Sequence, residues 1–133
     1  SRPTPPAEST AAEDRPEIVA VADLLRGRTL VLIGGERRPQ AQEALRRAFE
    51  LREVDWLDAK EHSSIAPFEA HVARPEVAVV VLAIRWTSHS FGEVKAFCDQ
   101  YDKPLVRLPG GYNPGQVAVQ VLAQCGERLA PQA

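Results

Sequence analysis

The chain of 133 residues is 44% hydrophobic and 26% charged, which is an ordinary composition for a globular protein with a single core. Sixteen lysines and arginines against eighteen aspartates and glutamates give a net charge of −2. This balance argues against a dedicated binder of duplex nucleic acid, which usually has a basic surplus. No apolar run reaches the roughly 18 residues that span a bilayer, so we expect no membrane partner.

The start of the chain differs in composition from the rest. Residues 1–15 combine three prolines with Glu, Ser, Thr and Ala and have no apolar period, which is typical of a linker or a disordered tail. Because the chain begins at Ser1, contains no methionine and shows no signal-peptide pattern, we expect it to belong to a longer protein. Residues 16–130 are then expected to form a single domain.

The apolar pattern alternates between helical and strand-like segments along this domain. The predicted helices begin near Pro16, Pro39, Ile65, Ser90 and Pro114. The predicted strands span Thr29–Ile33, Glu53–Leu57, Val77–Ile84 and Pro104–Leu108. A helix followed by four strand–helix units requires parallel strands with right-handed crossovers. We therefore predict an α/β fold, a three-layer Rossmann-like or flavodoxin-like open sheet of four parallel strands in the order 2-1-3-4, with helices on both faces.

Two of the predicted helices begin with recognisable capping residues. Ser90 and Glu93 have the S-x-x-E spacing of a capping box, in which each side chain bonds a free backbone N–H of the first turn. Asn113 followed by Pro114 is a similar signal, because asparagine is a favoured cap and proline suits the first helical position. We therefore interpret Ser90 as a helix cap and not as a nucleophile.

The cysteines and histidines do not form a metal or redox motif. Cys98 and Cys125 lack metal-binding or CxxC spacing and fall on apolar helix faces, so we expect reduced core residues in a cytoplasmic protein. His62, His71 and His89 lie on different predicted elements, without the spacing of a ligand set. We therefore predict neither a metal nor a cofactor.

Polar residues gather where the predicted strands end. Ligands of open α/β sheets bind at the carboxyl ends of the strands, at the point where the strand order reverses, which here lies between the first and third strands. A glycine turn before a helix binds anions, arginine clamps phosphate, and histidine can donate to a ligand oxygen. We predict a ligand site, with no assigned catalytic residue, formed by Gly34, Gly35, Glu36, Arg37, Arg85, Thr87, Ser88, His89 and Arg107.

Each of these residues also has a structural interpretation, which stays open. The glycine pair suits a tight strand-to-helix turn, since the chain contains neither G-x-G-x-x-G nor a P-loop motif. Arg85 and Arg107 are close to the ends of buried strands, where a charge needs an anionic partner. That partner is either a ligand or an internal carboxylate such as Glu36 or Glu93.

Four features together resemble one protein family. They are the strand that ends in Gly34-Gly35, Ser88-His89 after the third strand, Lys95 and Cys98 at matching offsets, and the last strand Lys103–Leu108. Over about Leu30 to Gly110, the chain resembles the small Rossmann-like family catalogued as domain of unknown function 2325 (DUF2325). It departs from that family at Glu36, in place of a histidine, and at Asp58-Ala59, in place of Asp-Gly. The resemblance implies the fold and carries no assigned activity.

Three kinds of function fit these features. The first is a regulatory or sensor module that binds an anionic or nucleotide-like metabolite, and this is the one we expect, rather than an enzyme. The second is a small hydrolase of phosphorylated nucleosides with His89 as acid or base, because Pro109–Tyr112 is similar to the Pro-Gly-Gly loop of nucleoside-monophosphate phosphoribohydrolases. The third is an interaction module, or a pocket for a neutral molecule. Two open sheet edges favour self-association, so we expect a homodimer.

Overall fold

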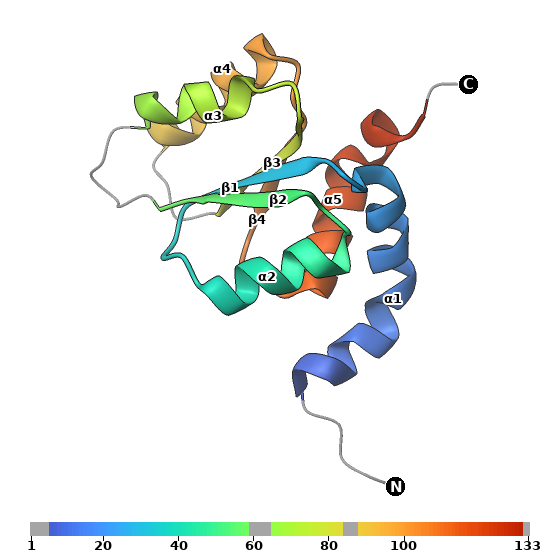
Figure 1. Cartoon of the computed structure of the whole chain (residues 1–133). Coiled ribbons are helices and arrows are strands. Elements are labelled where there is room, and N and C mark those ends of the chain that lie inside the picture. The colour runs from blue at the N-terminus through green and yellow to red at the C-terminus, as the bar shows by residue number, and fades with distance from the viewer. Residues whose placement is uncertain (1–5, 59–64, 84–87, 132–133) are drawn as a thin grey trace, which may run out of the picture.

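Four parallel strands form the centre of the molecule (Figure 1). The computed structural model describes residues 6–58, 65–83 and 88–131. The strands are β1 (Thr29–Ile33), β2 (Glu53–Leu57), β3 (Val77–Ala83) and β4 (Leu105–Leu108). Their order across the sheet is β2-β1-β3-β4, and each neighbouring pair is parallel. The predicted fold class and strand order are therefore confirmed.

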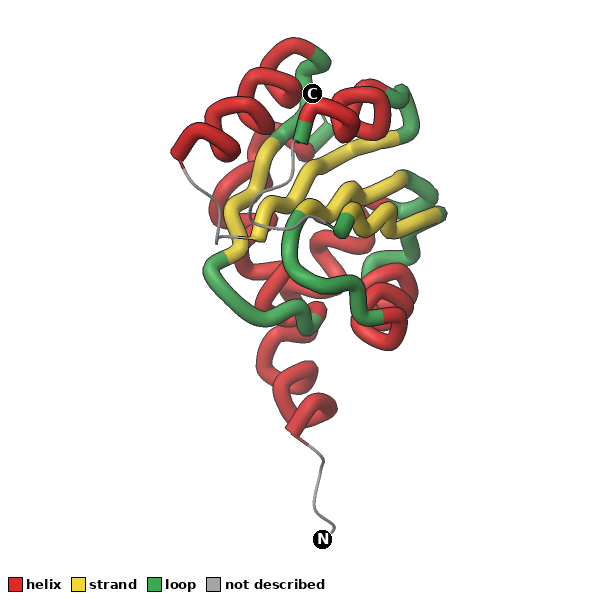
Figure 2. The backbone as a smooth tube through the Cα atoms, turned by 90° about the vertical axis from the view of Figure 1, so that its left-hand side faces the viewer, coloured by secondary structure: helices red, strands yellow, loops and turns green. Residues whose placement is uncertain are grey.

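Helices cover both faces of this sheet. One face carries α1 (Pro6–Leu25), α2 (Pro39–Ala48) and α5 (Pro114–Leu129). The other face carries the short η1 (Ala66–Phe68), α3 (Glu69–Ala73) and α4 (Ser88–Gln100). Figure 2 shows the strands as one layer between helices, which confirms the predicted three-layer arrangement. Among the described residues, no helix is both long enough and apolar enough to cross a membrane.

The central strands send side chains into two cores, one on each face. Every residue of β1 and β3 is buried, because a parallel strand covered on both faces has no solvent side. In β1, Leu30 and Leu32 pack toward α1, α2 and α5, whereas Val31 and Ile33 pack toward α3 and α4. The helix residues in these cores include Leu25, Leu45 and Val121 on the first face and Val72, Val94 and Cys98 on the second.

Two predicted helix starts were wrong. α1 begins at Pro6 and not at Pro16, so the segment 6–15 is helical where its composition predicts a linker. Alanine and glutamate favour a helix even without an apolar period, and Pro6 suits its first turn. Pro16 lies inside α1, where its missing N–H removes one hydrogen bond of the helix. α4 begins at Ser88, which places Ser90 inside the first turn and not at the cap. The role of the start of the chain as a tether stays a prediction.

Other predicted boundaries agree closely with the structure. α2 begins at Pro39, and α5 begins at Pro114 behind the cap Asn113. The side-chain oxygen of Asn113 accepts a hydrogen bond from the backbone N–H of Gln116 at 2.9 Å, as the capping signal predicts. The last residue of the predicted third strand, Ile84, lies outside the described residues.

Glutamine side chains occupy the free edges of the two outer strands. At β2, Nε2 of Gln42 donates to the carbonyl oxygen of Val54 at 2.6 Å. At β4, Oε1 of Gln124 accepts from the backbone N–H of Arg107, and Nε2 of Gln124 donates to the carbonyl of Arg107, each at 2.8 Å. Unpaired strand edges invite pairing with another chain, and groups that occupy them reduce that tendency. Gln42 and Gln124 thus bond backbone groups that a further strand would otherwise pair with, and the homodimer stays a prediction.

Both cysteines are free and buried, as predicted. Burial raises the pKa of the Cys98 thiol to about 12, with a smaller contribution from Asp99. Burial also raises the pKa of Cys125 to about 11. We predict that neither thiol of the native protein reacts with a disulfide reagent at pH 8, where a pKa of 11 leaves about one thiol in a thousand as thiolate.

The measurement is thiol titration of native protein and of protein unfolded in urea. Two thiols per chain should react only after unfolding, since the chain contains two cysteines. Rapid reaction of the native protein would contradict the placement of Cys98 and Cys125 in the two cores.

Candidate functional site

The site expected from the fold lies at the carboxyl ends of β1 and β3. These two strands are direct neighbours, and Ile33 near the end of β1 is paired with Leu82 near the end of β3. The chain leaves β1 through α2 on one face and reaches β3 through α3 on the other, so the strand order reverses between them. In sheets of this kind, the loops that follow the two strands border a crevice where ligands bind.

Gly34, the first residue after β1, has both backbone groups engaged. Its N–H donates to the carbonyl of Leu57 at 3.1 Å and so continues the pairing of β1 with β2. Its carbonyl accepts from the indole Nε1 of Trp56 at 3.0 Å. The φ of Gly34 is 111°, which a residue with a side chain rarely adopts. The residue is buried and completes the sheet, and its N–H does not point at a ligand.

Gly35 is a glycine because an aromatic side chain lies against it. Its φ is 67°, and a Cβ atom at this position would collide with the hydroxyl oxygen of Tyr112. The Tyr112 ring in turn packs on Trp56, with ring centroids 4.8 Å apart and an angle of 55° between the rings. The glycine pair therefore forms a tight turn beneath these two aromatic rings. This observation favours the structural interpretation of Gly34 and Gly35.

The two residues that follow the glycine turn, Glu36 and Arg37, lie on the surface. Glu36 and Arg37 both have exposed side chains. The backbone N–H of Arg37 donates to Oδ1 of Asp58 at 2.7 Å, which ties the turn after β1 to the end of β2. Its guanidinium donates to Oε1 of Gln42 at 3.2 Å. Arg37 is therefore held at its backbone while its charged group remains accessible to solvent.

The residues predicted after β3 are only partly described. Arg85 and Thr87 lie outside the described residues. Ser88 and His89 form the start of α4, and their side chains also lie outside the described part of the chain. The proximity of these four residues to the turn at Gly34 is thus a prediction that rests on the adjacency of β1 and β3.

Arg107 does not join the turn after β1. It lies on β4, which β3 separates from β1, and its guanidinium carbon lies 4.4 Å from the centroid of the Phe91 ring on α4. A cation over an aromatic face is attracted by the negative charge of the ring. Among the described residues, no carboxylate forms an ion pair with Arg107. The contact with the Phe91 ring thus stands where the sequence suggested a carboxylate partner such as Glu36 or Glu93 for Arg107.

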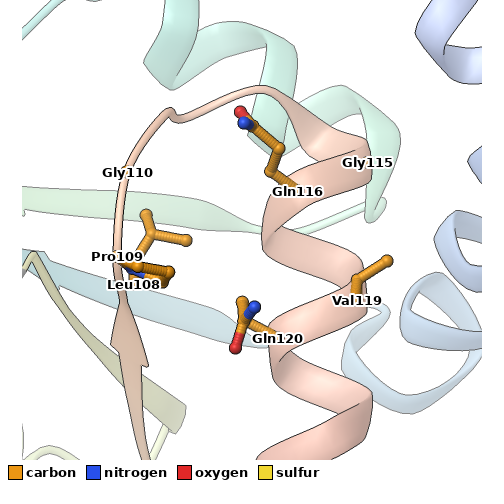
Figure 3. Close-up of a pocket in the computed structure, with 7 residues that line it drawn as sticks. All are labelled: Leu108, Pro109, Gly110, Gly115, Gln116, Val119 and Gln120. Atoms are coloured by element: carbon orange, nitrogen blue, oxygen red, sulfur yellow. The ribbon is translucent and has the colours of Figure 1, made fainter.

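The loop after β4 is organised as a helix entry. Gly111 has a φ of 73°, and a Cβ there would collide with the side chain of Gln116. Figure 3 shows Gln116 and Gln120 on α5 beside Leu108 at the end of β4 and the following Pro109 and Gly110, where a pocket of about 240 Å³ lies. The glycines of the Pro-Gly-Gly segment thus serve the turn into α5. Nothing in this arrangement favours a phosphate cradle of the phosphoribohydrolase kind over a helix entry.

A titratable cluster lies between β2 and α3. Oδ2 of Asp55 lies 2.8 Å from Nδ1 of His71 and accepts from the Arg74 guanidinium at 2.7 Å. Arg74 also lies 3.5 Å from Glu53 and 3.7 Å from Glu76. These pairs fix α3 to the neighbouring strands. Within residues 6–58, 65–83 and 88–131, no group of three or more His, Cys, Asp or Glu residues could hold a metal ion.

Three residues near the site were missed in the sequence. Trp56 and Tyr112 close over the glycine turn, and Asp58 holds the backbone of Arg37. The position of Asp58 directly after a strand was a usable signal, since polar groups at carboxyl ends of strands face the crevice. Nothing in the local sequence pairs Tyr112 with Gly35, because these residues are far apart along the chain.

The fold and its loops define the molecule as a doubly wound parallel α/β domain with a switch point between β1 and β3. No protein-family model matches the chain, and neither curated proteins nor solved structures give a significant match. The resemblance to DUF2325 therefore stays a prediction, and a proposal about function depends on the molecule itself.

The contact between Gly35 and Tyr112 makes a testable prediction. We expect Gly35→Ala to lower the free energy of unfolding by about 2 kcal/mol or more, because alanine at positive φ costs about 1–2 kcal/mol and its Cβ also meets the Tyr112 hydroxyl. Tyr112→Phe removes that hydroxyl, so Gly35→Ala should cost only about 1–2 kcal/mol in the Tyr112→Phe background. Urea unfolding of the four proteins measures this coupling, and additive effects would contradict the contact.

Proposed function

We propose that this domain is a regulatory or sensor module that binds a small anionic or nucleotide-like metabolite at the switch point, and that it is a member of DUF2325. One observation carries the proposal, the direct pairing of β1 with β3 up to Ile33 and Leu82. The chain segments that follow these strands supply the exposed Glu36 and Arg37 on one side and residues 85–89 on the other. Ligands bind at this position in open parallel sheets.

The side chains available there suit an anionic ligand. The Arg37 guanidinium is exposed, and the hydrogen bond from its backbone N–H to Asp58 fixes where the side chain starts. A guanidinium presents paired N–H donors that match the oxygens of a phosphate or carboxylate. Arg85 supplies a second cation in the sequence, while Ser88 and His89 supply hydroxyl and imidazole donors. We expect these groups to hold the charged end of the ligand.

The acidic residues favour a nucleotide-like ligand within this class. Asp58 follows β2, and nucleotide-binding sheets commonly place a carboxylate that accepts ribose hydroxyls after their second strand. Its Oδ1 accepts from Arg37, and a carboxylate has further acceptor sites on both oxygens. The exposed Glu36 lies one residue before Arg37. A ligand with a phosphate and a sugar would use both kinds of group.

Titration calorimetry against a panel of nucleotides and phosphorylated metabolites tests the proposal. We expect one member of the panel to bind, and Arg37→Ala, Arg85→Ala and His89→Ala each to weaken that binding by about tenfold or more, as expected for charged hydrogen bonds to a ligand. Arg52→Ala is the matched control. Arg52 is an exposed arginine immediately before β2, at the amino ends of the strands and therefore away from the proposed site at their carboxyl ends.

Two results would overturn the proposal. One is the absence of binding by any phosphorylated or anionic compound in the panel. The other is binding that survives all three substitutions at the switch point and is lost with Arg52→Ala.

A further inference from the structure

The outer edge of β4 lies in a groove between two helices. This groove is distinct from the switch point between β1 and β3, because β3 separates β4 from β1 and the groove lies at the outer edge of β4. It has a volume of about 210 Å³. Its lining comes from α4, the connection that follows α4, β4 and α5, and consists of Phe91, Lys95, Asp99, Lys103, Leu105, Arg107, Gln124 and Arg128.

Gln124 makes the hydrogen bonds that a neighbouring strand would make. A strand added beside β4 would accept from the N–H of Arg107 and donate to its carbonyl, and the amide of Gln124 does both at 2.8 Å. Nε2 of Gln124 also donates to Oε1 of Gln120 at 2.7 Å. These contacts are exposed, so each contributes little net stability and can be exchanged for an equivalent bond from another chain.

Cations outnumber carboxylates around this edge. Four lysines and arginines line the groove, against the single carboxylate of Asp99. The Lys103 ammonium donates to the carbonyls of Arg74 and Val77, and Arg128 pairs with the exposed Asp102 at 2.6 Å. Lys95 pairs with Asp99 at 2.8 Å, but both side chains are more than half exposed, and exposed pairs of this kind contribute little stability. The Arg107 guanidinium carbon lies 4.4 Å from the centroid of the Phe91 ring, and no carboxylate among the described residues forms an ion pair with it. Negative charge on a partner would therefore be attracted to this groove.

The alternation of β4 indicates how an added strand would be recognised. Val106 and Leu108 belong to the core with α1, α2 and α5, whereas Leu105 packs toward the opposite core and Arg107 lies on Phe91 of α4. A neighbouring strand would likewise turn alternate side chains toward α4. Acidic side chains at these alternate positions would meet Lys95 and Arg107.

We propose that the β4 groove binds an extended acidic segment of a partner protein, which adds to the sheet as a fifth strand and displaces the Gln124 side chain. Backbone hydrogen bonds to β4 would supply affinity, and alternate acidic residues would supply specificity. Charge complementarity and the strand-like pairing of Gln124 with Arg107 are the two observations that favour this occupant.

The probe is a fluorescein-labelled heptapeptide of alternating glutamate and valine, with glutamate at both ends. We expect it to bind the full chain in a polarisation assay, and a lysine–valine peptide of the same length not to bind. Two variants of the peptide carry N-methyl groups, one on every valine and the other on every glutamate. Since alternate N–H groups of a strand point to one edge, only one variant should lose affinity, by about tenfold or more.

Substitutions in the protein complete the test. Gln124→Ala should tighten peptide binding by about three- to tenfold, since it removes the competing amide, whereas Gln42→Ala at the β2 edge should have no effect. Lys95→Glu combined with Arg107→Glu should weaken binding by about tenfold or more, and Arg52→Glu should not. Thermal unfolding of each variant verifies that it is folded.

Several outcomes would overturn this proposal. They are failure of the glutamate–valine peptide to bind, equal binding of both N-methylated peptides, loss of binding with both of them, and weaker binding by Gln124→Ala. Dimerisation of Gln124→Ala without peptide, seen by sedimentation, would assign the edge to a second copy of the chain and would also contradict an acidic partner.

Discussion

The structure depends on one constraint, the burial of a parallel sheet on both faces. Each backbone group of β1 and β3 must be paired within the sheet, because the residues around it are apolar and exclude water. The apolar side chains of the helices on the two faces supply the cores but cannot form hydrogen bonds with the outer edges or the strand ends. Those positions are where the chain uses specific polar contacts, and they are also where we propose that it binds other molecules.

The edges and the carboxyl end satisfy this constraint in different ways. Gln42 and Gln124 reach from α2 and α5 to the outer strands, so that side-chain amides stand where further strands would lie. At the end of β1, Gly34 carries the pairing one residue further, and Trp56 bonds its carbonyl. The need to pair backbone groups thus explains both the hydrogen-bonded turn at Gly34 and the side-chain amide of Gln124 at β4, which we propose a partner strand displaces.

The sheet could be predicted because strands that are buried on both faces are continuously apolar, and this pattern is visible in a short stretch of sequence. The β-branched run at Val77–Ala83 and the helical period between the strands are properties of short segments. The contacts of Gly35 with Tyr112 and of Arg107 with Phe91 join distant segments, so no local pattern reveals them. The starts of α1 and α4 were predicted wrongly because local sequence is ambiguous there. The composition of residues 6–15 fits both a linker and a helix. A serine in the first turn of a helix, such as Ser90, has the same local pattern as a serine at the cap.

Amide-resolved NMR during titration with a nucleotide or phosphorylated metabolite tests the central claim most directly. A ligand at the switch point should shift the backbone resonances of Gly35, Glu36, Arg37 and residues 85–89, and leave that of Arg107 at the β4 edge unchanged. Saturable shifts confined to the β4 groove, or to the amino ends of the strands near Arg52, would contradict a ligand site between β1 and β3.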